Sequence, residues 1–84
     1  MEKPAFYYVY ILKSTVGTDR FYTGFTENLE NRLKDHNSGK DSHTVKYKTW
    51  RIKTAIAFSD RNKALEFERY LKSPSGRAFA KKRL

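Results

Sequence analysis

The sequence has 84 residues, 15% of them aromatic, and 18 Lys and Arg against 9 Asp and Glu, a formal net charge of +9. It contains no cysteine, which excludes a disulfide framework, a thiolate zinc site and a cysteine nucleophile. A chain of this length predicts one domain over residues 1–84 with a small core. The charge favours nucleic acid as a partner, although solubility or an acidic protein partner would also account for it.

No stretch resembles a signal peptide or a membrane span. The longest nearly apolar run, AFYYVYIL at 5–12, is far shorter than the roughly 20 residues that a spanning helix needs. We therefore expect a cytoplasmic protein that has no membrane partner.

The first part of the chain predicts a β-hairpin. Residues 6–14 are rich in aromatic and β-branched side chains, which indicates a strand, and both of its faces are apolar. Turn residues at 15–20 separate it from a second expected strand at 21–26. The first strand should therefore be covered on both sides.

A helix and a polar segment follow the hairpin. Asn28 can cap a helix over 29–37, and Gly39 can end it. Residues 40–48 are polar and basic, and we interpret them as an exposed loop.

The rest of the chain predicts a strand and two helices. Residues 50–58 alternate at period two, which would place on one face Trp50, Ile52, Thr54, Ile56 and Phe58. Ser59 can cap a helix over 60–73, which Pro74 would end, and 75–84 indicates a short basic helix. The order ββαβαα predicts an α+β fold with a small, mainly antiparallel sheet of three strands flanked by helices.

Two polar residues share the apolar face of the first helix. At about 100° per residue, Arg32 and His36 lie within roughly 100° of arc of Leu29 and Leu33. Arg32 could extend to water while His36 is satisfied by a backbone carbonyl. Alternatively, the pair is a fixed cation beside a group that handles protons or binds phosphate at a groove.

The second helix carries a carboxylate among apolar residues. Glu68 lies in the stripe formed by Ala64, Leu65, Phe67 and Leu71. A carboxylate there costs several kcal/mol unless it is paired, protonated or bound to metal. Either an ion pair with a lysine or arginine, or a metal ligand or acid–base group at a cleft, would account for it.

Two tyrosines complete the set of candidate residues. Tyr10 and Tyr22 lie in the two expected strands of the hairpin, and Gly24 follows two residues after Tyr22. A glycine inside a strand usually marks a bulge or the close approach of another group. Tyrosines in strands usually belong to the core, but these phenols could meet Arg32, His36 and the carboxylate of Glu68 if both helices pack on the hairpin.

Four stretches of the chain are YYVYILKS, YTG, NLENRLKDHNSGK and ALEFERYLK, in this order. Together they resemble the GIY-YIG nuclease superfamily, in particular its small single-domain bacterial proteins, and the resemblance covers the chain from Tyr7 to about Lys82. The sequence departs from the family pattern at Tyr8, where the name-giving glycine would stand, and at Thr23, which replaces the usual isoleucine.

The resemblance implies hydrolysis of nucleic-acid phosphodiester bonds by a divalent-metal-dependent endonuclease. The family's catalytic residues would be Tyr10, Tyr22, Arg32, His36 and Glu68. Glu68 would hold one Mg²⁺ or Mn²⁺ ion, which acts as a Lewis acid, and Arg32 would stabilise transition-state charge. Tyr10 is the first choice for the group that accepts a proton from water; Tyr22 would position that water.

The substrate is expected to be DNA rather than RNA, recognised by structure more than by sequence, with no obligate protein partner. The cations and the histidine expected to contact phosphates are Lys40, His43, Lys46, Lys48, Lys72, Arg77, Lys81 and Lys82. A basic module that binds nucleic acid without cleaving it is the alternative. A basic protein-interaction domain is a third interpretation, but it leaves Glu68 and the Arg32–His36 pair unexplained.

Overall fold

The structure is a computed structural model that describes residues 4–16 and 19–84. Its three strands are β1 (Tyr7–Ser14), β2 (Phe21–Thr26) and β3 (Trp50–Phe58). They form an antiparallel sheet in the order β2-β1-β3. The turn expected at 15–20 includes residues 17 and 18, which lie outside the described residues.

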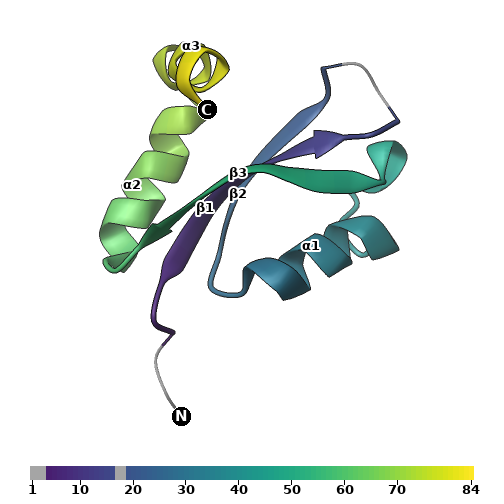
Figure 1. The fold of residues 1–84 in the computed structure, drawn as a ribbon, viewed down its shortest axis with the longest axis horizontal. Helices are drawn as coiled ribbons and strands as arrows, with labels where there is room; N and C mark the ends of the chain where they lie inside the picture. The colour runs from purple at the N-terminus through teal and green to yellow at the C-terminus, as the bar shows by residue number, and fades with distance from the viewer. Residues whose placement is uncertain (1–3, 17–18) are drawn as a thin grey trace.

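Helices cover both faces of this sheet. They are α1 (Leu29–Ser38), α2 (Arg61–Leu71) and α3 (Pro74–Arg83), with a 3₁₀ turn, η1 (Val45–Tyr47), before β3. In Figure 1, α1 lies on one side of the sheet, and α2 and α3 lie on the other. The predicted α+β fold and the order ββαβαα are confirmed. In the described ranges, no helix is long and apolar enough to cross a membrane.

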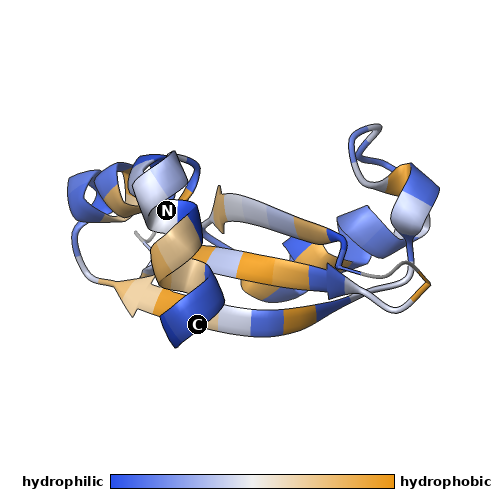
Figure 2. Cartoon of the chain, turned by 90° about the horizontal axis from the view of Figure 1, so that it is seen from above, coloured by the Kyte–Doolittle hydropathy of each residue, from blue (hydrophilic) through white to orange (hydrophobic). Residues whose placement is uncertain are grey.

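The central strand β1 supplies both halves of the core. Val9 and Ile11 face α2 and pack with Ala64 and Leu71. The alternate residues of β1 face α1, where the buried hydrophobic side chains are Tyr10, Leu12 and Trp50. Figure 2 shows hydrophobic residues along the strands, whereas the last turn of α3 is hydrophilic. The expectation that the first strand is covered on both sides is therefore confirmed.

The prediction that alternate residues of β3 share one face is wrong. Thr54 lies opposite Ile11, but Ile52 lies opposite Leu12, so the pairing shifts by one residue between these pairs. Such a bulge moves the following side chains to the other face. Trp50 and Ile52 consequently pack on the α1 side, whereas Phe58 packs on the α2 side.

Side-chain caps set the helix boundaries. Asn28 caps α1 by accepting from the backbone N–H of Asn31, and Gly39 ends it in the left-handed region at φ 85°, both as predicted. The predicted cap of α2 is wrong: Asp60, not Ser59, accepts from the N–H of Lys63, and α2 spans Arg61–Leu71. The terminal helix begins at Pro74, one residue earlier than predicted, because Ser73 caps it.

The interpretation of 40–48 as an exposed loop is also wrong in part. Thr44 is buried, and the side chain of Asp41 is only 8% exposed. The indole N–H of Trp50 donates to the backbone oxygen of Thr44 at 2.8 Å. The segment between α1 and β3 is thus folded against the core, which brings its polar residues to the site described next.

Candidate active site

The β-hairpin places both phenols under α1. Tyr10 lies opposite Gly24 in the pairing of β1 with β2, and Tyr22 lies opposite Leu12. The rings of Tyr10 and Tyr22 are 6.2 Å apart between centroids. A Cβ atom at Gly24 would lie 2.5 Å from the Tyr10 hydroxyl oxygen, closer than van der Waals contact allows. The glycine predicted to mark a close approach therefore makes room for Tyr10.

His36 is fully buried between two hydroxyl groups. Its Nε2 lies 3.0 Å from the Tyr10 hydroxyl and its Nδ1 lies 2.8 Å from Thr44 Oγ1. Burial, and then the charge of Arg32, lowers the pKa of the imidazole, while the carboxylates of Asp41 and Asp35 oppose that shift. The ring is therefore neutral at pH 7, and hydroxyl groups, rather than the backbone carbonyl considered from the sequence, satisfy it.

The groups around His36 favour one tautomer, with the proton on Nδ1, because the carboxylate oxygen Oδ2 of Asp41 also lies 3.7 Å from Nδ1. The Thr44 hydroxyl donates to the backbone oxygen of Asp41 at 3.4 Å, so its own oxygen is free to accept from Nδ1–H. Nε2 then accepts from the Tyr10 hydroxyl. The network directs the proton of Tyr10 towards His36.

Tyr10 is 1% exposed, which makes its phenolate unfavourable. Burial, followed by the neighbouring phenol of Tyr22, raises the pKa of Tyr10 to about 12, although Arg32 opposes this shift. At pH 7 the phenol is therefore protonated. It can accept a proton from water only if it passes its own to another group.

Arg32 lies between the phenols and a carboxylate. Its Nη2 donates to Asp41 Oδ2 at 2.6 Å, and its Nη1 is 3.9 Å from Asp35. Burial alone would lower the pKa of this guanidinium, but the neighbouring groups, Tyr10 first and then Tyr22 and Asp41, raise it above its usual value. Its side chain is 32% exposed, so it is a fixed cation that solvent can still reach.

The structure does not join Glu68 to these four residues. Glu68 lies on α2, which packs on the other face of the sheet, and its Oε2 is 2.9 Å from Nζ of Lys72. Among the described residues, no hydrogen bond or ion pair links Glu68 to Tyr10, Tyr22, Arg32 or His36.

The donor chemistry of Glu68 nevertheless fits a hydrated metal ion. Within residues 4–16 and 19–84, no group of three His, Asp or Glu side chains could hold an ion. Magnesium keeps most of its waters and needs only one or two carboxylates. Glu68 is 20% exposed, and Lys72 is 52% exposed and can move away, because exposed ion pairs contribute only about 0–1 kcal/mol.

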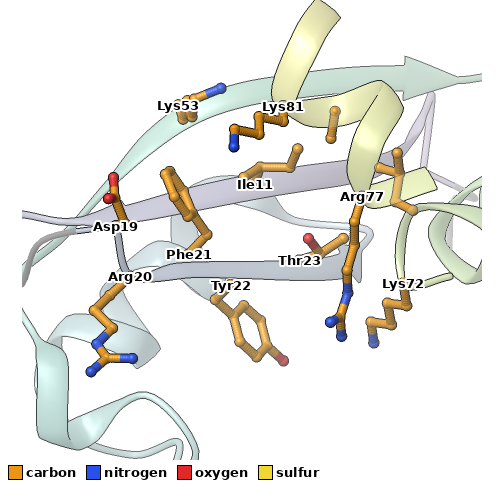
Figure 3. A pocket seen from close by; sticks show the side chains of 12 residues that line it. Ile11, Asp19, Arg20, Phe21, Tyr22, Thr23, Lys53, Lys72, Arg77 and Lys81 are labelled. Carbon is orange, nitrogen blue, oxygen red and sulfur yellow. The ribbon is translucent and has the colours of Figure 1, made fainter. Parts of the chain in front are cut away.

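A basic groove lies along β2 and α3, beside Tyr22. The charged residues that line it are Asp19, Arg20, Lys53, Lys72, Arg77 and Lys81. Figure 3 shows Phe21 and Thr23 on one side of β2 and Tyr22 on the other, with Arg77 and Lys72 beside them. The groove has five cations for one carboxylate, a ratio well above the 18 to 9 of the whole chain.

The expected phosphate contacts therefore fall in two places. Three of them, Lys72, Arg77 and Lys81, line the basic groove, and Lys82 is exposed on α3 beyond its lining. The others are exposed between α1 and β3: Lys40, His43, Lys46 and Lys48. Arg20 and Lys53 line the groove but were not predicted from the sequence, because strand pairing brings them there.

Asp41 and Thr44 also contact the site, and the sequence interpretation missed both. They lie in a polar segment whose composition suggests only exposure. One local signal was present, since an Asp can accept from the backbone two residues on, as Asp41 Oδ1 does from His43 N–H at 2.9 Å. That pattern predicts a tight turn but not which residues the turn contacts.

The chain is similar in sequence to several known proteins. The family model described as the GIY-YIG catalytic domain matches residues 6–83. The chain is 36% identical over 70 residues to a UPF0213 protein of Bacillus licheniformis. The aligned residues cover 82% of this chain and 70% of that protein. A UPF0213 protein of Lactiplantibacillus plantarum is 36% identical over 72 residues, which cover 82% of this chain and 69% of that protein.

A further relative carries a functional name. The structure-specific endonuclease subunit SLX1 of Debaryomyces hansenii is 36% identical over 78 residues, which span 84% of this chain but only 22% of that protein. The match is thus confined to a part of SLX1 of about the size of this chain. Together with the family match over residues 6–83, these relatives show that the chain belongs to the GIY-YIG nuclease superfamily.

Proposed function

We propose that this protein is a divalent-metal-dependent endonuclease that hydrolyses phosphodiester bonds in DNA and recognises structure more than sequence. The observation that carries the proposal is the convergence of Tyr10, Tyr22, Arg32 and His36 from two strands and α1. Membership of the superfamily and the endonuclease named among the relatives support it.

The proton of the attacking water passes through Tyr10 to His36. Since His36 is neutral and its Nε2 accepts from the Tyr10 hydroxyl, the phenol can receive a proton as it releases its own. This transfer does not require a resting phenolate, which the raised pKa of Tyr10 disfavours. Tyr22, which lines the basic groove, positions the water.

Arg32 stabilises the negative charge that develops on the phosphate in the transition state. It is held in place by Asp41 and remains partly exposed, so a phosphate oxygen can approach it. A cation fixed before the reaction contributes more than one that must reorganise, because its orientation has already been set.

Glu68 would hold one Mg²⁺ or Mn²⁺ ion at the edge of the sheet, where its partner Lys72 and the site residue Tyr22 line the same groove. When bound, the ion supplies Lewis-acid stabilisation of a phosphate oxygen and of the leaving 3′ oxygen. To accept it, Glu68 must exchange its contact with Lys72. Lys72 also lines the basic groove, and a substrate phosphate can become its new partner.

The basic groove holds the substrate backbone. Its cations can reach phosphates but present few groups that distinguish bases, so the sequence preference should be weak. Release of counterions from the backbone makes this binding strongly dependent on salt.

The decisive test is cleavage of supercoiled plasmid and branched DNA by pure protein with Mg²⁺ or Mn²⁺. Glu68→Gln and Arg32→Ala should abolish cleavage while the circular dichroism spectrum is unchanged. Glu66→Gln is the matched control, because Glu66 is exposed on the same helix. Cleavage that survives Glu68→Gln, or that needs no metal, would contradict the proposal.

A basic module that binds nucleic acid without cleaving it is the second candidate. The ion pair of Glu68 with Lys72 favours it, because that contact is the alternative to metal binding. Salt-sensitive binding of DNA and RNA, with no metal-dependent cleavage of any substrate, would establish this function instead.

A further inference from the structure

The turn between α1 and η1 contacts both candidate site residues of α1, Arg32 and His36. The Asp41 carboxylate accepts from Arg32 at 2.6 Å, and the Thr44 hydroxyl is hydrogen-bonded to His36 at 2.8 Å. Asp41 Oδ2 is also 3.7 Å from His36 Nδ1. Two residues of one short turn thus hold the cation and the imidazole of the site.

Backbone contacts make this turn a rigid support. The carbonyl oxygen of Asp41 accepts from the N–H groups of Thr44 and Val45 at 3.2 and 3.1 Å. Its carboxylate also accepts from the N–H of His43, and the Trp50 indole donates to the oxygen of Thr44. The side chains of Asp41 and Thr44 therefore have fixed positions.

We propose that Asp41 and Thr44 are positioning residues for the reaction proposed above, on which this inference rests. Asp41 fixes the guanidinium of Arg32 beside the phenols of Tyr10 and Tyr22. Thr44 fixes His36 in the tautomer whose Nε2 accepts the proton of Tyr10.

The chemistry of Thr44 explains why a hydroxyl is needed there. A hydroxyl that donates to the backbone can only accept from the imidazole, which places the proton of His36 on Nδ1. Without this acceptor the imidazole can carry its proton on Nε2 instead. The Tyr10 hydroxyl would then accept from Nε2–H instead of donating to it, and the path of the proton from Tyr10 to His36 would be interrupted.

Because Asp41 carries a charge, removing that charge distinguishes a positioning role from an effect on substrate binding. A carboxylate 2.6 Å from the guanidinium competes with a substrate phosphate for Arg32. If competition were its only effect, removing the charge would tighten substrate binding. If it positions Arg32, removing the charge slows the chemical step, because small displacements of a catalytic group lower the rate by up to about 100-fold.

The first test compares Asp41→Asn with the wild type in steady-state cleavage of a labelled branched DNA. We expect kcat to fall about 10- to 100-fold while KM stays within about threefold. Asp35→Asn is the matched control, because Asp35 contacts the same arginine at 3.9 Å and is more exposed; its kcat should stay within about twofold. A lower KM with unchanged kcat in Asp41→Asn overturns the positioning role.

The second test does not depend on cleavage. NMR of the ring nitrogens of His36 should show Nδ1–H in the wild type and in Thr44→Ser, and a loss of this single tautomer in Thr44→Val. An unchanged tautomer in a folded Thr44→Val variant overturns the role of Thr44. A wild type that shows the expected tautomer but cleaves no DNA contradicts the proposed function and leaves this tautomer assignment standing.

Discussion

The hydroxyl of Tyr10, on the central strand, is hydrogen-bonded to Nε2 of His36, on α1, at a distance of 3.0 Å. Both side chains are at most 1% exposed, so neither can exchange this partner for bulk water without a rearrangement. A buried polar group that loses its partner keeps the full cost of desolvation. The contact therefore couples the stability of the fold to the chemistry of the site.

The first prediction separates the two tyrosines. Tyr10→Phe should lower the free energy of unfolding by about 1–3 kcal/mol, because it leaves Nε2 of His36 without its donor in the buried site. Tyr22→Phe, at a half-buried position, should change it by less than about 1 kcal/mol. Both variants should lose cleavage activity, so activity does not distinguish them. Urea unfolding at pH 7 measures the difference between their free energies of unfolding. Equal losses in both variants would show that the buried hydrogen bond contributes nothing to the free energy of unfolding.

The second prediction concerns pH. His36 must be neutral to accept a proton, and burial lowers its pKa, so kcat/KM should fall on acidification with a midpoint below the ordinary histidine value of about 6.5. Since the charge of Asp41 opposes that lowering, Asp41→Asn should move the midpoint to still lower pH. His43→Gln is the control, because it removes the other histidine of the chain, whose protonation would add a phosphate contact; the midpoint that belongs to His36 should persist without it. A midpoint that Asp41→Asn raises would show that another group titrates.

The third prediction tests the contact of Gly24 with Tyr10. Gly24→Ala places a methyl group where the Tyr10 ring lies and should lower the free energy of unfolding by about 1–3 kcal/mol. Cleavage should also decrease, because Tyr10 must move away from His36. The matched control is Ala55→Ser, since Ala55 lies opposite Tyr10 on the other neighbouring strand and is exposed. If thermal unfolding gave both variants the same stability, the close packing at Gly24 would be contradicted.

The sequence predicts the order of the elements well because each has a local signal. The alternation of residues 50–58 and the caps at Asn28 and Gly39 depend on nearby residues, and the structure confirms the strand and both caps. The bulge in β3 could not be predicted in this way. Helices cover both faces of the sheet, so alternate residues stay partly buried on either side of the shift, and the hydropathy pattern continues through it.

The residues of the candidate site differ in the same way: some have a local signal in the sequence, and others do not. Arg32 and His36 stand out because they interrupt an apolar helix face, which is a local observation. Asp41 and Thr44 do not, since a polar turn is ordinary until its contacts with α1 are known. For Glu68 the sequence left two alternatives, an ion pair or a metal ligand. The spacing allows Lys72, four residues away, to approach the carboxylate, but it does not exclude a metal ion.

The last prediction concerns Lys72, which contacts the proposed metal ligand and also lines the basic groove. Lys72→Gln removes a cation 2.9 Å from Glu68, so the Mg²⁺ concentration that gives half-maximal cleavage should fall by about two- to fivefold. The same substitution removes a phosphate contact, so KM for DNA should rise and its dependence on salt should weaken. Two parameters should therefore move in opposite directions, which general damage to the protein would not produce. Lys63→Gln removes the same charge from an exposed position on α2 and should leave the metal requirement unchanged. A metal requirement that neither substitution alters would mean that Glu68 binds no ion in competition with Lys72.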